Sequence, residues 1–316
     1  MAATIPTVEL SNGVKIPVYG AGTGFLDKDR GLLAPEEACK SVTIALDAGV
    51  RHIDAALAYR TQNHIANILR KNYTEGCLER KNIFLTSKVF QPFIPILLPS
   101  TAMPSNQDSM TPDEVTTIVR NHFEQCIVEL GVGYIDLMLL HWPATINSQD
   151  VEGNRSRRLA AWKVLEEMYE KGFATAIGVS NFNEIHLTQL KEDGAKIQPM
   201  VNQIEASPYV QYDKIIDYCK ENNIVVEAYS PLSGGTFLSD PAILSLVRKY
   251  KKDAGQICLK YLIQRGYVVV VRSQRRHHSN IDIFDFELSE DDMNKIIGLN
   301  KGIEGSSGLT NPYSMA

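Results

Sequence analysis

Short apolar runs alternate with longer amphipathic stretches along most of the chain. The short runs are nearly continuous in hydrophobic residues, which is typical of parallel strands covered on both faces. We expect strands at Val18–Gly22, His52–Ala55, Ile83–Lys88, Ile135–His141, Thr175–Val179, Met200–Glu205, Ile224–Tyr229 and Tyr267–Val271. The pattern therefore predicts a parallel sheet.

The stretches between these runs carry helix-end signals. Pro35–Ala48 starts with proline and is followed by Gly49, while Thr111–Leu130 starts with Thr-Pro-Asp-Glu and stops before Gly131. Proline in the first turn and glycine after the last are the positions that helices favour. We expect further helices at Arg157–Lys171, Tyr212–Asn222, Ala242–Tyr250 and Gln256–Arg265. Repeated strand-then-helix units predict an α/β fold, a closed (β/α)₈ TIM barrel with residues 1–316 in one domain.

An open doubly wound sheet is the alternative fold. Its dinucleotide fingerprint, Gly-x-Gly-x-x-Gly after an early strand, is missing, because the Gly22–Gly24 segment is too short and opens no helix. Three segments lie outside the repeat. Val8–Pro17, with Asn-Gly at its centre, predicts an N-terminal β-hairpin plug. Gln91–Met110 is an insertion after the third strand, and the tail Gly302–Ala316 is expected to fold over the active-site mouth.

Composition excludes several classes of protein. The chain carries 32 Lys and Arg residues against 37 Asp and Glu, a formal net charge of −5, which disfavours a nucleic-acid or anionic-membrane partner. No apolar stretch approaches the length of a membrane span. Five cysteines, with no two at metal-ligand spacing, and no visible secretory signal favour a reducing, cytoplasmic location. We expect no metal and a monomer, and leave weak dimerisation open.

Four polar residues stand where predicted strands end. Asp54 ends the second strand, Tyr59 lies five residues further on, Lys88 ends the third strand and His141 ends the fourth. In a (β/α)₈ barrel these ends converge on one site, so polar residues there are candidates for catalysis. Taken singly, Asp54 with Lys88 could be a structural ion pair, Tyr59 a packing residue and His141 a core histidine. Their joint occurrence at strand ends favours a site.

Six motifs in order, from about Val8 to about Asn300, resemble the aldo-keto reductases: His52-Ile-Asp-Ala-Ala-Leu-Ala-Tyr59, Thr86-Ser-Lys-Val89, Leu139-Leu-His-Trp-Pro143, Gly178-Val-Ser-Asn-Phe182, Val201-Asn-Gln-Ile-Glu205 and Ala228-Tyr-Ser-Pro-Leu232. Each motif alone is a weak signal, whereas six in the family's order are a strong one. The resemblance implies NADPH-dependent reduction of an aldehyde or ketone.

The resemblance also implies roles for the four residues. Tyr59 would give the proton to the carbonyl oxygen after hydride transfer, although its ordinary pKa of about 10 is high for this task. The Lys88 ammonium would lower that pKa, and Asp54 would keep Lys88 charged and oriented. His141 would donate a hydrogen bond to the carbonyl oxygen or help to relay the proton.

A second set of residues is expected to hold the cofactor, NADPH or NADP⁺. By resemblance, Ser180, Asn181 and Gln203 would bind the nicotinamide carboxamide, and Tyr229 would stack on the ring. The small-residue loop that begins at Ser230 would approach the pyrophosphate through its backbone amides. Thr23 and Leu232 complete this part of the expected cofactor set.

The segment after the eighth predicted strand is basic. The family pattern there has Lys-Ser, an arginine and an asparagine, and this chain has Arg272, Ser273, Arg276 and Asn280 with two residues fewer between them. Arginine forks suit a 2′-phosphate, which favours NADPH over NADH. A solvated basic loop is the plainer alternative. The adjacent histidines His277 and His278 lack a third partner for a metal.

Several positions around the expected pocket depart from the family pattern. The tryptophan expected after Thr23 is replaced by Gly24-Phe25, the position after Val89 is Phe90, and Thr61-Gln62 stands where the family has Asn-Glu. Phe25, Phe90 and Trp142 are expected to line the substrate side. An apolar pocket with one polar corner suits a small-molecule carbonyl substrate of moderate size.

Three rival functions remain open. The chain could be a cofactor-binding regulatory subunit with little turnover, a barrel that binds carbonyl ligands without reaction, or a flavin-dependent barrel oxidoreductase. The regulatory role usually needs extra assembly segments, and a flavin enzyme does not need the Asp54, Tyr59, Lys88 and His141 set. Incubation with NADPH and a panel of carbonyl compounds separates these functions.

Overall fold

The computed structural model describes residues 5–24, 26–27, 31–32, 35–90, 110–144, 148, 150–306 and 311–315, with only the backbone for 26, 27, 31, 32 and 36–38. In this part of the chain, parallel strands close into a barrel in the order β10-β11-β12-β3-β6-β7-β8-β9. The barrel strands are β3 (Tyr19–Gly22), β6 (His52–Asp54), β7 (Phe84–Val89), β8 (Ile135–Leu140), β9 (Ala174–Ser180), β10 (Val201–Glu205), β11 (Val225–Tyr229) and β12 (Val268–Val271). Each lies within one residue of its predicted bounds, and the predicted barrel is confirmed.

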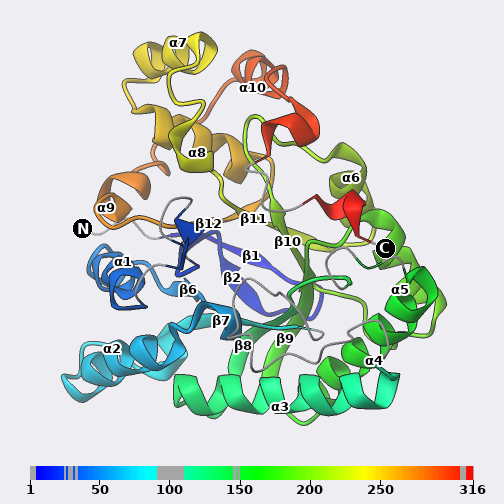
Figure 1. Cartoon of the computed structure of the whole chain (residues 1–316). Coiled ribbons are helices and arrows are strands. Elements are labelled where there is room, and N and C mark those ends of the chain that lie inside the picture. The colour runs from blue at the N-terminus through cyan, green and yellow to red at the C-terminus, as the bar shows by residue number, and fades with distance from the viewer. Residues whose placement is uncertain are drawn as a thin grey trace.

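Helices surround the barrel as an outer ring (Figure 1). They are α1 (Pro35–Asp47), α2 (Gln62–Thr74), α3 (Pro112–Leu130), α4 (Val151–Glu170), α5 (Glu184–Glu192), α6 (Asp213–Glu221), α7 (Pro241–Tyr250), α8 (Ala254–Gln264), α9 (His277–Asn280) and α10 (Glu290–Ile297). The N-terminal signals work as predicted in α3, where the Thr111 side chain accepts from the Glu114 backbone N–H and Glu114 returns a bond to Thr111.

The predicted start of the fourth helix was wrong by six residues, because α4 begins at Val151 and not at Arg157. Asp150 caps this helix by accepting from the backbone N–H of Gly153 at 3.0 Å. A side chain at Gly153 would collide with Asp150, so glycine, normally a poor helix residue, is required there. The Arg157 guanidinium pairs with Asp150 at the helix start and donates to the Met110 carbonyl, so local contacts support the earlier start of α4.

The N-terminal hairpin closes the barrel at the N-terminal ends of its strands. Its strands β1 (Thr7–Glu9) and β2 (Lys15–Pro17) pair antiparallel, and Ile16 is fully buried. Asn12, in the turn, donates to the backbone carbonyl of Thr175 at 2.8 Å, close to the start of β9. The expected hairpin is thus confirmed at the N-terminal ends of the strands, which leaves the C-terminal ends for chemistry. A second small hairpin, β4 (Leu26–Asp27) with β5 (Gly31–Leu32), follows β3.

The insertion lies outside the described residues except for Met110, and so do positions 307–310 and 316 of the tail. The described tail residues 311–315 lie at the α5 side of the barrel (Figure 1), where Asn183 and His186 hydrogen-bond to the carbonyls of Pro312 and Met315. The tail is therefore anchored beside the mouth by α5 and the residue before it.

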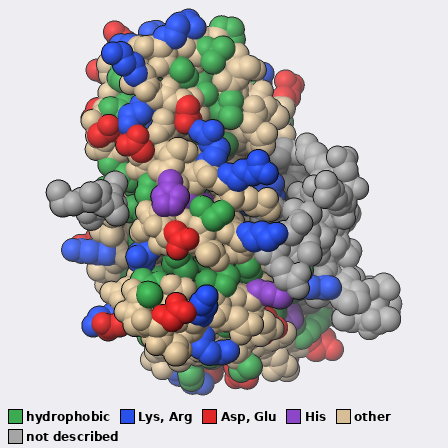
Figure 2. Space-filling view, turned by 90° about the vertical axis from the view of Figure 1, so that its left-hand side faces the viewer, with side chains coloured by type: hydrophobic (Ala, Val, Ile, Leu, Met, Phe, Trp, Pro, Cys, Tyr) green, Lys and Arg blue, Asp and Glu red, His purple; other side chains and the backbone are tan. Residues whose placement is uncertain are grey.

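Charges of both signs are interspersed on the face that carries α1, α2 and α9 (Figure 2). Hydrophobic side chains are scattered singly among them, which is ordinary for a protein surface. None of the helices in the described residues is both long and apolar enough to cross a membrane.

Close approach of strands inside the barrel requires glycine at one position of β9. A Cβ atom added at Gly178 would lie 2.5 Å from the Val201 carbonyl oxygen and 2.9 Å from the Leu139 side chain. We predict that Gly178→Ala lowers the free energy of unfolding by about 1–3 kcal/mol, because β8 or β10 must move. Denaturant unfolding measures this change. Gly133→Ala, where the added methyl meets nothing within 4 Å, is the matched control and should change stability by less than about 0.5 kcal/mol.

Candidate active site

The four residues expected to be catalytic come together at the C-terminal ends of three neighbouring strands. Asp54 ends β6, Lys88 lies in β7, and His141 directly follows β8; β7 pairs with both other strands. Tyr59 ends the 3₁₀ helix η1 (Leu57–Tyr59), which continues from β6. Register and strand order therefore bring together residues up to 87 positions apart, and sequence reasoning placed all of them in one cluster.

Lys88 is the centre of this cluster. Its ammonium is fully buried and donates to Asp54 Oδ1 at 2.5 Å, to the Ala55 carbonyl at 3.0 Å and to the Tyr59 hydroxyl at 3.4 Å. Burial alone lowers the pKa of Lys88, but the charge of Asp54 and the neighbouring Tyr59 outweigh it and the pKa is raised. Lys88 therefore stays a cation, with three oxygen atoms around it.

The net pKa of Tyr59 differs from the expectation based on Lys88 alone. The Lys88 charge lowers the pKa of Tyr59, as expected, yet burial raises it more, so the net pKa of Tyr59 lies above its ordinary value of 10.0. Burial disfavours the charged tyrosinate, and sequence alone gives no measure of that cost. Lys88 thus offsets part of the increase in pKa that burial causes at Tyr59, but it does not bring this pKa below its ordinary value.

His141 sits beside this hydroxyl as an uncharged ring. Its ring lies edge-on to the Tyr59 ring with 5.7 Å between centroids. Burial, followed by the charge of Lys88, brings the pKa of His141 well below 6.5, so the ring is neutral near pH 7. Its Nδ1 atom is buried and has no hydrogen-bond partner among the described residues. A neutral imidazole can donate one hydrogen bond but is not a strong acid.

Two residues after β3 set the position of Tyr59. Thr23 is fully buried, where its hydroxyl donates to the Asp54 carbonyl at 2.9 Å and lies 3.0 Å from the Thr61 hydroxyl. A Cβ added at Gly24 would lie 2.8 Å from Cζ of Tyr59. The departure from the family pattern at Gly24 therefore has a physical consequence, since the Tyr59 ring packs against the bare glycine backbone.

Aromatic rings lie beside His141, where the sequence predicts the substrate side. Trp142 stacks on His141 with 5.8 Å between centroids, and Phe90 lies 6.3 Å from His141. Both side chains are mostly buried, while Phe25 lies outside the described residues. A hollow of about 300 Å³ lies beside Phe90 and is otherwise lined by Leu57, Arg60, Asn63, His122, Gln125 and Glu129. Its walls are mostly polar and include none of the four candidate catalytic residues, so the expected apolar pocket stays a prediction.

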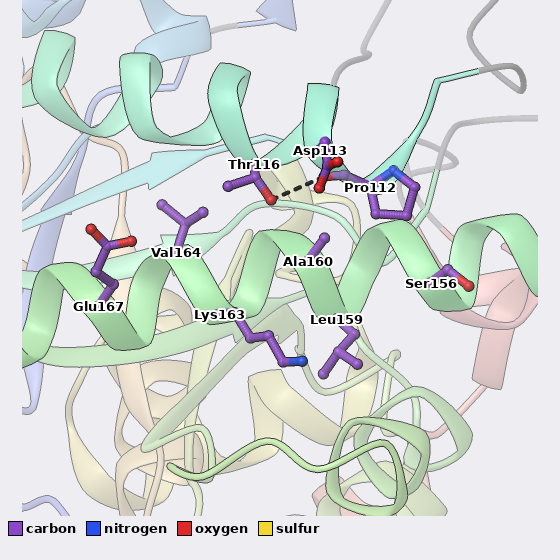
Figure 3. A pocket seen from close by; sticks show the side chains of 9 residues that line it. All are labelled: Pro112, Asp113, Thr116, Ser156, Leu159, Ala160, Lys163, Val164 and Glu167. Atoms are coloured by element: carbon purple, nitrogen blue, oxygen red, sulfur yellow. Dashed lines mark hydrogen bonds between the residues drawn. The ribbon is translucent and has the colours of Figure 1, made fainter.

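A groove of about 410 Å³ lies on the outer wall, between α3 and α4 (Figure 3). Pro112 and Thr116 line it from α3, and Leu159, Lys163 and Glu167 line it from α4. It shares no residue with the expected site, so it has no part in the chemistry at the strand ends.

The residues expected to hold the nicotinamide form one hydrogen-bonded group. Asn181 donates to the His141 carbonyl and to the Ser180 hydroxyl, and its Oδ1 accepts from the Tyr229 hydroxyl at 2.9 Å. The Ser180 hydroxyl donates to the Gln203 carbonyl at 2.8 Å. Asn181 has both amide hydrogens engaged and retains only acceptor capacity. It also adopts a φ of 63°, a conformation that non-glycine residues rarely adopt and that occurs often at functional sites.

The loop after β11 has an unusual backbone. Ser230 and Ser233 have φ values of 51° and 41°, and Gly234 and Gly235 follow at 64° and 92°. Leu232 is half-buried and its carbonyl accepts from the Gly235 N–H at 2.7 Å. Successive left-handed residues can turn backbone N–H groups toward one concave side, an arrangement that binds anions such as phosphate.

The basic loop after β12 is held by internal bonds. The Ser273 hydroxyl accepts from the Arg276 N–H at 2.8 Å, and the Arg276 guanidinium pairs with Asp253 at 2.5 Å on the surface. Arg272 is exposed in the same loop. Asn280 is only 2% exposed and donates to the Tyr19 hydroxyl, so its side chain lies inside the wall and not on the loop surface.

Three buried residues near the site were given no role there from the sequence, although His277 was considered and set aside as a metal ligand. His277 is fully buried between the hydroxyls of Tyr19 and Ser41, at 2.8 and 2.9 Å, and fixes the basic loop to the barrel wall. His52 and Glu227 lie inside the barrel below Asp54. The signal for Glu227 was present, because a carboxylate interrupts an otherwise apolar predicted strand. Among the described residues, no group of three side chains forms a metal-ligand cluster.

The sequence has curated relatives that match over nearly their whole length. A sequence model of the Aldo/keto reductase family matches residues 19–301. Glyoxal reductase of Bacillus subtilis is 35% identical, over 93% of this chain and 93% of its own. Aldose reductase C of Dictyostelium discoideum is 34% identical, over 96% and 92%. Estradiol 17 beta-dehydrogenase 5 of Mus musculus is 33% identical, over 96% and 94%.

Solved structures agree with the sequence relatives. An aldo-keto reductase of the silkworm Bombyx mori in complex with NADP has a TM-score of 0.79 and 29% identity, over 95% of this chain and 94% of its own. A second aldo-keto reductase, complexed with NADPH, has a TM-score of 0.82 and 29% identity, over 99% and 94%. With the same barrel and the same order of motifs, the chain belongs to the aldo/keto reductase family.

Proposed function

We propose that this protein reduces an aldehyde or ketone to the alcohol with NADPH, using Tyr59 as proton donor with Lys88, Asp54 and His141. The observation that carries the proposal is the contact of the buried Lys88 ammonium with both Asp54 and the Tyr59 hydroxyl. A structural ion pair would need only the first contact. The second contact places the Lys88 ammonium beside the Tyr59 hydroxyl, and packing of the tyrosine ring does not require a cation there.

The chain's own residues account for the proton step. When bound, NADPH supplies the hydride that the carbonyl carbon receives. The carbonyl oxygen then gains negative charge and requires a proton from a nearby acid. Tyr59 is suited to this task because Lys88 stabilises the anion that remains after the proton leaves. Asp54 holds Lys88 in place and keeps it charged.

His141 has a narrower part than the sequence suggested. Because burial lowers the pKa of His141 well below 6.5, the ring is uncharged near pH 7 and has no acidic proton of an imidazolium to give. A neutral N–H donor orients and polarises a carbonyl oxygen without losing its proton. We therefore assign His141 to binding the substrate oxygen, and the proton to Tyr59.

The residues present fit the nicotinamide end of the cofactor. Asn181 and Gln203 each have an amide oxygen with acceptor capacity left, because their N–H₂ groups bond within the protein. Amide acceptors suit the N–H₂ group of a carboxamide. Ser180 and Tyr229 hold Asn181 in place. The silkworm relative in complex with NADP supports this assignment by similarity.

The residues also fit the phosphates. The left-handed stretch from Ser230 to Gly235, with Leu232, offers backbone N–H groups for the pyrophosphate. Arg272, Ser273 and Arg276 offer charge and hydrogen bonds for a 2′-phosphate. The buried Thr23 and Asn280 serve as supports of the site and not as direct contacts.

We further propose that residues 1–316 work as a single-domain monomer in a reducing compartment such as the cytoplasm. All five cysteines are free, and four of them are buried in the fold. Burial raises the pKa of the Cys126 thiol to about 12, which makes it unreactive. Free, buried thiols suit a reducing compartment.

A direct assay tests the proposal. The protein is mixed with NADPH and a panel of aldehydes and ketones, and loss of the reduced-nicotinamide absorbance is followed. Turnover with one or more members is expected. Tight NADPH binding without any turnover would instead support a cofactor-binding regulatory protein.

Tyr59→Phe should remove the proton donor while leaving the ring in place. We expect the reduction rate to fall by about 10²–10⁴-fold, with little change in NADPH affinity, because general acid catalysis contributes that much. Steady-state rates and cofactor fluorescence titration measure the two effects. Tyr73→Phe is the control, since it removes a buried hydroxyl that has no partner among the described residues. Full activity of Tyr59→Phe would reject the assigned donor.

Gly24→Ala should move Tyr59 without touching its chemistry. The new methyl would lie 2.8 Å from the Tyr59 ring, so the ring and its hydroxyl must shift from their position beside Lys88. We expect a rate loss of about 10–100-fold, because small misplacements of catalytic groups are costly, and unchanged NADPH affinity. Gly298→Ala, with ordinary contacts near 3.5 Å, should behave as wild type. An unchanged rate in Gly24→Ala would mean that Tyr59 needs no close packing.

Arg276→Ala should discriminate between the two cofactors. We expect NADPH affinity to fall by about tenfold or more and NADH affinity by much less, because only NADPH has the phosphate that a guanidinium fork binds. Titration with each cofactor measures this. Arg275→Ala removes the same charge from an exposed neighbour and is the matched control. Equal losses for NADPH and NADH would refute the phosphate role.

A further inference from the structure

A carboxyl group lies inside the barrel, below the catalytic cluster. Glu227, in the middle of β11, has no exposed surface. Its neighbours in the adjacent strands β10 and β12 are Gln203 and Val268, which carry no charge. A buried carboxylate needs compensation, so its partners decide whether it carries charge at all.

One amide nitrogen joins this carboxyl to the active site. Gln203 Nε2 donates to Glu227 Oε2 at 2.7 Å and to Asp54 Oδ1 at 2.9 Å. Asp54 Oδ1 also accepts from Lys88 at 2.5 Å. The position of Glu227 is therefore transmitted through a single side chain to the atom that holds Lys88.

The other oxygen of Glu227 faces a histidine. His52 Nε2 lies 3.4 Å from Glu227 Oε1, and its Nδ1 lies 3.4 Å from the Pro17 carbonyl of the hairpin. A carbonyl oxygen only accepts, so a hydrogen on Nδ1 of the neutral ring suits this contact, and Nε2 then accepts from the Thr86 hydroxyl, which lies 3.0 Å away. Glu227 Oε1 itself has no hydrogen-bond partner among the described residues, so nothing at this oxygen compensates an ionised carboxylate. Gly20 leaves the room that the His52 ring occupies.

The charge balance of the cluster points the same way. Among the described residues, the titratable groups that face or act on Glu227 are His52 and Asp54 from β6, Lys88 from β7 and Tyr59 from η1. One cation is present for two carboxyl groups. Asp54 contacts that cation directly, so Asp54 keeps the negative charge, and a second buried anion would have no counterion.

The pKa directions agree with this geometry. Burial, with the charge of Asp54 next in size, raises the pKa of Glu227 to about 8. Burial likewise lowers the pKa of His52 to about 4, so His52 is neutral at pH 7. The proton therefore resides on Glu227 below about pH 8 and is lost above it.

We propose that Glu227 is a positioning residue of the active site. As an uncharged acid, it holds Gln203 against Asp54 and adds no further charge beside the Lys88–Asp54 pair. Loss of its proton adds a negative charge to the cluster. That charge raises the pKa of Tyr59 and makes it a weaker proton donor. Activity in the reducing direction should then decline as the pH rises through the ionisation of Glu227. This inference rests on the proposed role of Tyr59.

Infrared spectroscopy tests the protonation state without any turnover. Wild-type protein should show the carbonyl stretch of a buried carboxylic acid at pH 6.5, and the band should disappear with a midpoint near pH 8. Glu227→Gln should lack the band. Glu205→Gln, which changes another buried glutamate that bonds to Ser306, should keep it. Absence of any such band in wild type would overturn the proposal, whether or not the variant folds.

The pH profile of the reduction rate tests the consequence. Between pH 7 and pH 9 we expect the wild-type rate to fall by about tenfold, and that of Glu227→Gln by less than about twofold, because glutamine keeps the bond from Gln203 but never ionises. Glu205→Gln should follow wild type. A variant that retains the full wild-type decline would overturn the link to Tyr59, since a merely structural role would lower the rate equally at every pH. Absence of turnover in every form would instead reject the proposed function and leave the infrared result standing.

Discussion

The buried contact between the Lys88 ammonium and the Asp54 carboxylate is the interaction on which the site depends. Removing two charges from water costs several kcal/mol per ion, and their attraction offsets this only when further hydrogen bonds satisfy the remaining atoms. Here the Ala55 carbonyl and the Tyr59 hydroxyl complete the surroundings of Lys88, and Gln203 donates to Asp54. Such a pair weakly favours stability at best. A buried pair of this kind is explained when the cation also acts on a third group, and here that group is the Tyr59 hydroxyl.

The rigid barrel lowers the entropic cost of forming this ion pair. Adjacent strands fix Asp54 and Lys88 by their backbone pairing, so neither long side chain has to be ordered by the contact itself. The hairpin closes the opposite end and presents the Pro17 carbonyl to His52. A column of polar side chains thus runs along the barrel interior, through Glu227 and Gln203 up to Asp54. Because each member is hydrogen-bonded or faces a complementary group, the column stays compatible with an otherwise apolar core.

Sequence patterns predicted the strands and the clustering of the four candidate residues because both follow from local rules. Apolar runs mark buried parallel strands, and polar residues at their ends mark the open face. Helices α2, α5 and α10 were not predicted. The capping box of α5 uses His186 in place of the usual acid or amide, whereas α10 begins with an ordinary Ser289 cap, so the sequence carried a usable signal for α10. The net pKa of Tyr59 was beyond prediction for a different reason. Lys88 could be identified as a neighbour, but the larger effect of burial depends on every side chain that closes over the ring.

The position of Gly24 links this frame to the choice of substrate. A tryptophan there would be part of the pocket wall in the family pattern, and its loss leaves Tyr59 packed on backbone. Among the described residues, the aromatic rings beside His141 are those of Phe90 and Trp142, on the β7 and β8 side. The curated relatives include proteins named glyoxal reductase and estradiol 17 beta-dehydrogenase 5, and these names refer to molecules of very different size. A shared fold does not fix the substrate, so the residues that line the site, such as Gly24, are where differences in substrate choice have to arise.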